Sequence, residues 1–517
     1  MGKLQDAQIA GAQVDDIRGM CMSSPFYPTL YQVNVRVWLR LLAASRRRSV
    51  TLDDIPDAAL DQWQRQGFDW IYLLGVWQTG TIAPQISRTN PTWVSAYHEL
   101  LSDLTAADVC GSCFAIAGYT AHTELGGDAA LRRFRDRLHQ RGLKLMLDFV
   151  PNHTAPDHPW VTAHPDFYMQ GTAEQLAAAP ENYGRFGDRI FAYGRDPYFP
   201  GWCDTLQLNY ANPHLQTVQR AELLRIAQWC DGLRCDMAML VESDIFCRTW
   251  DLSRIPAFWP EAIAQVRAHH PDFVFMAEVY WGLEWAMQQQ GFDYTYDKSL
   301  YDRLRLGQAR AVREHFWAAL DYQAKSVRFL ENHDEPRAAA VFDFDRHRAA
   351  AIITFLCPGL RFFHQGQFEG YPFHISIHLN RGPVVAENPD VQRFYQVLLQ
   401  CLRSPLFKTG NGQLATCTPA WQDNPTADQF IAWYWWDDSR GHGEGARGLA
   451  IVNYAPHAGQ CYLQLPEPIP VFSGLYRLCD YFTGVEYDRP GELFFGQGVY
   501  FDLPAWGYHV FAVTAIA

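Results

Sequence analysis

The sequence predicts an α/β protein built on a (β/α)8 barrel, with a loop domain inserted after strand three and a C-terminal antiparallel β domain. Two observations support this fold class. Apolar runs alternate with amphipathic helical runs up to about residue 404, and short alternating segments take over after Pro405. We expect the barrel to comprise residues 1–150 and 205–404, the inserted domain residues 151–204, and a β-sandwich domain residues 405–517.

The barrel elements follow one another in the order strand, helix, strand, often with a glycine at the end of the helix. This order is typical of parallel βα units. Residues up to about 27 form a lead-in without a clear pattern. The expected strands are residues 30–37, 70–74, 143–148, 232–236, 273–278, 291–296, 327–334 and 360–366. The expected helices are residues 54–66, 131–140, 215–229, 261–268, 311–320, 346–355 and 389–402.

Two stretches break this order. Residues 151–204 are rich in His, Pro, Gly, Tyr and Phe, and they are too long for an ordinary connection, which predicts an inserted domain or a large loop. After residue 405, segments such as 449–454, 460–465 and 500–503 alternate between apolar and polar residues and are separated by Pro and Gly. That pattern predicts antiparallel strands.

The composition fits a large globular protein. Hydrophobic residues make up 48% of the 517 residues, which is enough for an extensive core. Aromatic residues make up 15%, including 18 Trp. This excess suits a protein that stacks flat ligands such as sugars, and it equally suits a large aromatic core.

Charge and cysteine usage exclude several classes of partner. With 43 basic and 56 acidic residues the net charge is −13, which disfavours a nucleic-acid partner. No apolar run has the length of a membrane span, and Met1–Met20 lacks the apolar core of a secretion signal. The 12 Cys show no paired metal-ligand spacing and are expected to be free thiols. We therefore expect a cytoplasmic protein without a membrane partner, and the sequence leaves its oligomeric state open.

Four of the apolar runs end in carboxylates, which are Asp148, Asp236, Glu278 and Asp334. They follow the third, fourth, fifth and seventh expected strands, so a barrel would bring them together at one end. Each could be a solvated residue at the end of a strand. Burying four carboxylates together is costly unless they are used or paired, so their matched positions favour a functional site.

The residues around these acids resemble the α-amylase family of glycoside hydrolases (family thirteen). The matching segments occur in the family's order over residues 30–400. Residues 118–127 resemble the family's loop after strand two, and residues 358–367 resemble its strand-eight motif. The four signature regions are matched by Asp148–His153, Gly232–Asp236, Ala277–Glu278 and Phe329–Asp334.

This resemblance implies the role of each carboxylate. Asp236 would be the nucleophile that forms a glycosyl-enzyme intermediate, and Glu278 the general acid and then the general base. Asp334 would bind sugar hydroxyls and favour the distorted ring. Such retaining cleavage needs two carboxyl groups about 5 Å apart. Arg234 precedes Asp236 by two residues, which places both on one face of the strand, where Arg234 would keep Asp236 ionised.

The resemblance also implies a set of substrate-binding residues. His153 and His333 would bind hydroxyls of the same sugar, although each could simply be a satisfied histidine at the end of a strand. Tyr119 would form a stacking floor under the sugar, and Asp148 would brace the site. Arg337, close behind Asp334, completes the expected set.

The sequence departs from the starch-cleaving members of the family at Met239 and Leu240, where many of them carry Lys and His for the leaving-group side and a calcium ion. Asn152 is a possible calcium ligand, but a single Asn makes no site. We therefore expect no required cofactor. Residues 152–160 and 332–337 are closer to the oligo-1,6-glucosidase branch, which favours small substrates.

The sequence thus predicts an enzyme, a retaining α-glycoside hydrolase acting on maltooligosaccharides or small α-glucosides. An α-glucan transglycosylase or a sugar isomerase would use the same carboxylates, so these activities stay open as alternatives. A non-catalytic barrel that binds glycans or a protein is the third alternative. It is disfavoured because Asp236, Glu278 and Asp334 are all present.

Overall fold

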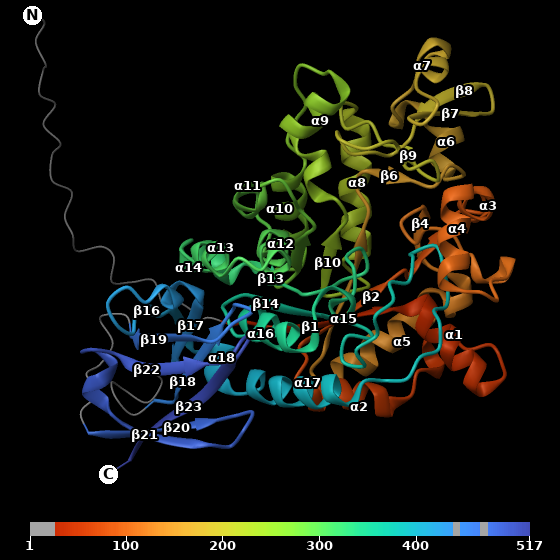
Figure 1. The fold of residues 1–517 in the computed structure, drawn as a ribbon. Coiled ribbons are helices and arrows are strands. Elements are labelled where there is room, and N and C mark those ends of the chain that lie inside the picture. Colours follow the sequence, from red (N-terminus) through yellow and green to blue (C-terminus); the bar gives the residue numbers. More distant parts are fainter. Residues whose placement is uncertain (1–25, 438–444, 466–473, 517) are drawn as a thin grey trace, which may run out of the picture.

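The computed structural model describes residues 26–437, 445–465 and 474–516. Eight parallel strands close into a barrel in the order in which they follow along the chain, which confirms the predicted fold class (Figure 1). These strands are β1 (Thr29–Asn34), β2 (Trp70–Leu74), β5 (Lys144–Phe149), β10 (Gly232–Cys235), β11 (Val274–Ala277), β12 (Tyr294–Tyr296), β13 (Ser326–Arg328) and β14 (Leu360–His364).

Most of the helices surround the barrel and connect its successive strands. The longer ones are α1 (Val35–Arg46), α2 (Asp57–Gln66), α4 (Pro91–Leu100), α5 (Gly127–His139), α8 (Pro213–Ile226), α10 (Trp259–His269), α12 (Lys298–Leu306), α16 (Phe344–Phe355) and α17 (Pro389–Leu402). The shorter ones are α3 (Ile82–Thr89), α6 (Pro159–Ala163), α7 (Ala173–Ala178), α9 (Ser243–Trp250), α11 (Glu284–Gln289), α13 (Ala309–His315), α14 (Leu320–Ala324), α15 (Ala338–Val341) and α18 (Pro405–Thr409). Of these, α6 and α7 lie in the inserted segment, and α18 follows the barrel.

Several barrel strands are shorter than the sequence predicts, among them β1 and β13. The first ends at Asn34 instead of residue 37, because the Asn34 side chain accepts a hydrogen bond from the backbone N–H of Val37 and caps α1. The seventh ends at Arg328, so the motif Phe329–Asp334 lies in the loop after the strand. Apolar alternation alone did not reveal either end.

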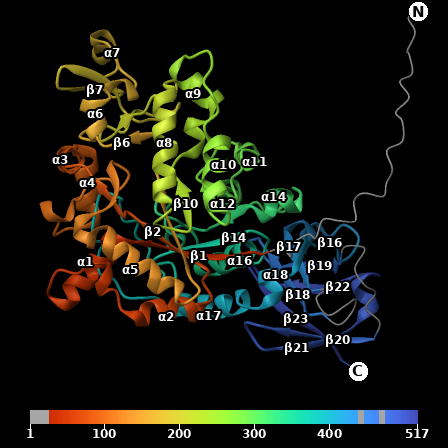
Figure 2. The same cartoon turned by 180° about the vertical axis from the view of Figure 1, so that it is seen from behind.

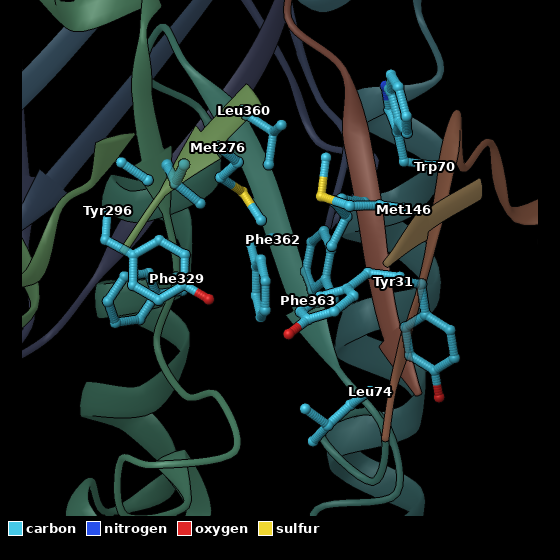
Figure 3. Close-up of a cluster of buried hydrophobic side chains, with 14 of the residues drawn as sticks. Tyr31, Trp70, Leu74, Met146, Met276, Tyr296, Phe329, Leu360, Phe362 and Phe363 are labelled. Carbon is cyan, nitrogen blue, oxygen red and sulfur yellow. The ribbon is translucent and has the colours of Figure 1, made fainter. Parts of the chain in front are cut away.

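Aromatic and methionine side chains fill the barrel interior. Figure 3 shows Phe362 of β14 in this cluster with Tyr296, Phe329 and Met276. The Phe362 ring meets Tyr296 edge-on, with 6.0 Å between ring centroids, and meets Phe329 at 6.2 Å. The barrel is therefore a packed core, and only its mouth can hold a ligand.

The segment between β5 and β10 stands apart from the barrel, at the end remote from the C-terminal domain in both views (Figures 1 and 2). It contains two small antiparallel sheets. One pairs β6 (His153–Thr154) with β9 (Leu206–Gln207), and the other pairs β7 (Tyr183–Phe186) with β8 (Arg189–Ala192). A third two-stranded sheet, β3 (Trp77–Thr79) with β4 (Ile116–Ala121), lies between β2 and β5 in the chain.

The C-terminal part forms two antiparallel sheets around a separate apolar cluster. The six-stranded sheet contains β15 (Asn411–Leu414), β17 (Phe430–Trp436), β18 (Arg447–Asn453), β23 (Tyr508–Ile516), β20 (Leu475–Asp480) and β21 (Glu486–Pro490). The three-stranded sheet contains β16 (Thr416–Pro419), β19 (Gly459–Gln464) and β22 (Val499–Leu503).

Arg361 of β14 joins this part to the barrel. It is fully buried, and its guanidinium donates to the backbone carbonyls of Tyr27, Phe355 and Phe407. Within the described ranges every cysteine is a free thiol, and no helix there is long and apolar enough to cross a bilayer.

Candidate active site

One buried arginine gathers the carboxylates at the barrel mouth. Arg234 of β10 lies opposite Asp148 of β5 in the parallel register. Its Nη1 donates to Asp236 Oδ1 at 2.7 Å and lies 3.4 Å from Asp148 Oδ1. Its Nη2 donates to Glu278 Oε2 at 2.7 Å. The structure thus brings together three of the four acids at the ends of strands through a single guanidinium.

Glu278 is held through both of its oxygen atoms. Tyr280 Oη donates to Oε1 at 2.6 Å, and the backbone N–H of Met237 donates to Oε2 at 2.7 Å. Met237 has a φ of 41°, in the left-handed region that a side chain with a Cβ rarely adopts. This unusual backbone directly after Asp236 belongs to the turn that presents its N–H to the carboxylate.

Asp334 is the fourth carboxylate and the one that opens to solvent, with 41% of its side chain exposed. Its Oδ2 lies 2.9 Å from His333 Nε2 and 3.9 Å from Arg234 Nη2. Gln32 Nε2 donates to the other ring nitrogen of His333 at 2.9 Å, so the Nε2 proton faces Asp334. A substrate that enters the mouth would meet Asp334 first.

The environments of the acids separate their pKa values. Burial raises the pKa of Asp236 to about 6, since Arg234 offsets only part of the effect of burial and of the neighbouring carboxylates. Burial likewise raises the pKa of Glu278. Burial also opposes ionisation of Asp334, but His333 and Arg234 outweigh it and hold the pKa at about 2. At neutral pH Asp334 is ionised and Asp236 mostly so.

Asp148 lies deeper than the other three. Tyr72 Oη donates to its Oδ1 at 2.5 Å, and Trp77 Nε1 donates to its backbone carbonyl at 2.7 Å. The side chain is buried, and burial raises its pKa. These contacts suit a residue that holds Arg234 in place.

Three other residues that the sequence predicts to bind substrate make contacts with neighbouring residues of the protein. The Tyr119 hydroxyl bonds to both the N–H and the carbonyl of Val150, at 2.9 and 3.1 Å. Arg337 pairs with Glu331 at 2.8 Å. The His153 ring lies 5.3 Å from Trp202, and burial lowers its pKa to about 4. A role in substrate binding stays a prediction for each of these three residues.

The structure also places residues at the site that the sequence did not reveal. The Phe114 ring centroid lies 5.1 Å from Arg234 Cζ and 5.4 Å from the His333 ring. His374 Nε2 donates to the His333 carbonyl at 2.6 Å. Tyr280 follows Glu278 by two residues, and that spacing on an extended chain was a usable signal. Phe114 and His374 lie outside any regular helix or strand, where no periodic pattern marks them.

Asn152 does not fit a calcium ligand set. Its side-chain oxygen and its backbone carbonyl both accept hydrogen bonds from Gln207 Nε2, at 2.9 and 3.0 Å. In the part of the chain that the structure describes, no group of three or more His, Cys, Asp or Glu could hold a metal ion. Calcium needs six or more oxygen ligands, and Asn152 alone supplies too few.

Two exposed aromatic residues, Tyr198 and Trp281, form a pair close to Glu278. Trp281 follows Glu278 by three residues and is 40% exposed, while Tyr198 of the inserted segment is 61% exposed. Their rings meet edge-on with 5.0 Å between centroids. The pair bridges the inserted segment and the loop after β11, and it leaves aromatic surface open to a ligand.

Comparison with known proteins gives one consistent result. Residues 113–381 match the model of the α-amylase catalytic domain. The chain is 30% identical to an α-1,4-glucan:maltose-1-phosphate maltosyltransferase of Burkholderia pseudomallei over 48% of this chain and 19% of that protein. It is 23% identical to a probable oligo-1,6-glucosidase of Bacillus subtilis over 46% of this chain and 51% of that protein. The matched region therefore spans about half or less of these relatives.

The fold also resembles solved structures. A noncanonic maltogenic α-amylase from Thermotoga neapolitana superposes with a TM-score of 0.66 at 16% identity, covering 95% of this chain and 99% of that one. A trehalose-6-phosphate hydrolase from Bacillus licheniformis gives a TM-score of 0.63 at 14% identity, covering 94% and 99%. At these identities the likeness concerns the fold alone.

Proposed function

The chain belongs to the α-amylase family, and from this premise we propose that it is a retaining α-glycosidase acting on maltooligosaccharides or small α-glucosides. The observation that carries this proposal is the shared arginine. Arg234 holds Asp236 and Glu278 at 2.7 Å each, so two carboxyl groups stand on either side of one cation at the barrel mouth. Such a pair suits cleavage through a covalent intermediate.

In the first step, the ionised Asp236 attacks the anomeric carbon of the bound sugar. The bond from that carbon to the leaving oxygen breaks, and the Glu278 carboxyl gives its proton to this oxygen. In the second step Glu278 takes a proton from water, which displaces Asp236 from the sugar. Two inversions at the anomeric carbon leave the product with its original α configuration.

The remaining contacts supply positioning and electrostatics. Asp334 is held ionised beside His333, where it can accept hydrogen bonds from sugar hydroxyls and stabilise positive charge developing on the ring. Arg234 keeps Asp236 charged before the attack. It also remains paired with Glu278 after that residue has lost its proton.

The loop after β14 supports a preference for short substrates. His374 reaches the His333 carbonyl, and Arg381 pairs with Asp108 at 2.8 Å. The loop thereby crosses one side of the mouth. Met239 and Leu240 beyond Asp236 are buried and offer no polar groups to an extended glucan.

A panel of purified α-1,4-, α-1,6- and α-1,1-linked disaccharides and maltooligosaccharides tests this proposal. We expect release of glucose or maltose, with the α-anomer appearing first in the proton NMR spectrum. The β-anomer as first product would contradict the retaining mechanism. Binding without turnover of any sugar would instead favour a non-catalytic barrel.

A transglycosylase is the second candidate, and the Tyr198–Trp281 pair favours it. An aromatic platform beside Glu278 can hold a second sugar, which would compete with water for the glycosyl-enzyme intermediate. Incubation with maltotriose distinguishes the two activities. Products longer than the substrate indicate transfer, whereas glucose and maltose alone indicate hydrolysis.

A further inference from the structure

The loop between β14 and α17, residues 365–388, contains no helix or strand, and yet its backbone is anchored. The His378 carbonyl accepts hydrogen bonds from the backbone N–H groups of Cys110 and Gly111, at 2.8 and 3.2 Å. Leu379 is fully buried in a small apolar cluster with residues of α4. These contacts fix the loop to the segment between β2 and β5, so it does not swing freely over the barrel mouth.

Side chains of the loop anchor it in two directions. Arg381 pairs with Asp108 at 2.8 Å. The His378 ring stacks on Trp93 of α4, with 4.4 Å between ring centroids. On its other side, His378 Nε2 lies 3.4 Å from Oδ2 of Asp204, a buried residue of the inserted segment. The loop is therefore held between α4 and the inserted segment.

His374 lies in the part of this loop that passes the carboxylates. Its Nε2 donates to the backbone carbonyl of His333 at 2.6 Å, one residue before Asp334. Burial raises the pKa of Asp334, whereas His374 is one of the neighbouring basic groups that lower it. The ring of His374 thus stands at the same corner of the mouth as the exposed carboxylate of Asp334.

One ring nitrogen of His374 is left for a ligand. Because Nε2 carries the proton that bonds to the His333 carbonyl, Nδ1 of the uncharged ring is an acceptor. The residue is exposed, and across residues 26–437, 445–465 and 474–516 this nitrogen finds no hydrogen-bond partner. A sugar hydroxyl is a donor that can satisfy it.

We propose, on the basis of the proposed function, that His374 determines specificity by accepting a hydrogen bond from the 4-hydroxyl of the sugar whose bond is cleaved. Asp236 and Glu278 act at carbon 1, and carbon 4 lies across the ring, on the side of Asp334 and His374. In an internal sugar of an α-1,4-glucan this oxygen is linked and has no proton to donate. His374 therefore selects a chain end, and the enzyme removes glucose from the non-reducing end.

The first test follows the initial products from an aryl α-maltoside. An enzyme that admits only a chain end releases glucose first, whereas one that accepts two sugars beyond the cleaved bond releases maltose. We expect glucose first from the parent. His374→Ala should remove the barrier and raise the initial ratio of maltose to glucose by about tenfold or more.

Two conservative variants separate recognition of the hydroxyl from support of the loop. Asn places an acceptor where Nδ1 stands, and Gln places a donor where Nε2 stands. The parent should cleave a 4-deoxy aryl α-glucoside with a kcat/KM about three- to tenfold below that of the 4-hydroxy compound, as loss of one hydrogen bond predicts. His374→Asn should keep this preference, and His374→Gln should lose it.

His98→Ala is the matched control, since it removes an exposed histidine of α4 outside the loop and should equal the parent in both assays. Maltose as the first product of the parent, or an unchanged product ratio in His374→Ala, would overturn the inference. A preference that survives in His374→Gln but not in His374→Asn would also overturn it, and would leave His374 only a supporting contact with His333.

A binding measurement keeps this inference separate from the proposed function. If the parent cleaves neither aryl glycoside, the proposed function fails. Calorimetry with methyl α-glucoside and its 4-deoxy analogue still decides the role of His374, because binding needs no turnover. A preference for the 4-hydroxyl that is kept by His374→Asn and lost by His374→Gln supports the inference, and equal affinities of the parent for both sugars contradict it.

Discussion

Two buried arginines of the barrel hold carboxylates in opposite ways. Arg328 of β13 pairs with Asp297, and Asp297 also bonds to His315 Nε2 at 2.9 Å. The other N–H groups of Arg328 donate to the Gln323 side chain and to the Pro358 carbonyl. The second arginine, Arg234, faces four carboxylates. One cluster is balanced in charge, and the other has an excess of acid.

The pKa values follow this difference. Burial disfavours the charged form of Asp297, but His315 and Arg328 outweigh it and lower the pKa. At Arg234 one cation cannot offset burial and mutual repulsion, so the pKa values of Asp236 and Glu278 are raised. A balanced cluster stabilises the fold, whereas carboxylates kept together at a cost indicate chemistry.

The strongest test of this contrast is Asp236→Asn. We expect turnover of an aryl α-glucoside to fall by about 10⁴-fold or more, because the nucleophile is lost. The melting temperature should not fall, since one charge of a crowded set disappears. Activity close to that of the parent would show that Asp236 is not the nucleophile.

Glu278→Gln tests the acid role. Cleavage of sugars with poor leaving groups should fall by about 10²- to 10⁴-fold, because these leaving groups depend on protonation. Formation of the intermediate from an activated aryl glycoside, followed as a burst of product, should be much less affected. An equal loss on both substrates would argue against general acid catalysis by Glu278.

Asp297→Asn examines the balanced cluster. Removing one partner of a buried pair should lower the free energy of unfolding by about 3–5 kcal/mol, measured by denaturant titration. The folded fraction should keep the turnover number of the parent. A loss of turnover at unchanged stability would mean that this cluster serves catalysis.

The smallest expected effect is the pH dependence of stability and activity, which differs between the clusters around Arg234 and Arg328. The pKa of Asp236 is raised in the folded state, so this group favours folding most below its unfolded pKa and loses that contribution as the pH rises to about 6. Catalysis needs its ionised form, so kcat/KM should fall as the pH drops through about 6. The pKa of Asp297 is lowered, so its stabilising contribution should persist over this range and be lost only in stronger acid.

A matched pair of melting curves checks these signs. Between about pH 4 and 6, the stability of Asp236→Asn relative to the parent should increase with pH, because only the parent then carries the buried charge. A constant difference over that range would contradict a raised pKa at Asp236.

The sequence predicted the barrel because its strands are apolar on both faces and its acids stand at strand ends. The meeting of Asp148, Arg234, Asp236 and Glu278 followed from the geometry of parallel strands alone. The predicted end of β1 was wrong, because the Asn34 side chain caps α1 where the apolar alternation would extend the strand. Local chemistry outweighed the periodic signal at that position.

The sequence did not reveal several residues of the site, and the reason differs from that at β1. His374 and Phe114 reach the site from loops whose paths depend on tertiary contacts such as the pair between Arg381 and Asp108. Gln32 lies on a predicted strand, but only closure of the barrel shows that it faces His333. Such positions carry no signal in a single sequence, because partners distant along the chain decide them.

Arg361 makes the stability of the barrel depend on the C-terminal domain. Its guanidinium fastens three carbonyls from the lead-in to β1, the end of α16 and α18, and the Trp435 ring of the C-terminal sheet lies against it. Excision of the C-terminal domain would remove the Phe407 carbonyl and the Trp435 ring from this cation and would expose apolar surface. A fragment ending at residue 404 should therefore be a substrate for proteases rather than a minimal enzyme, and scanning calorimetry of the intact chain should record one endotherm for both parts.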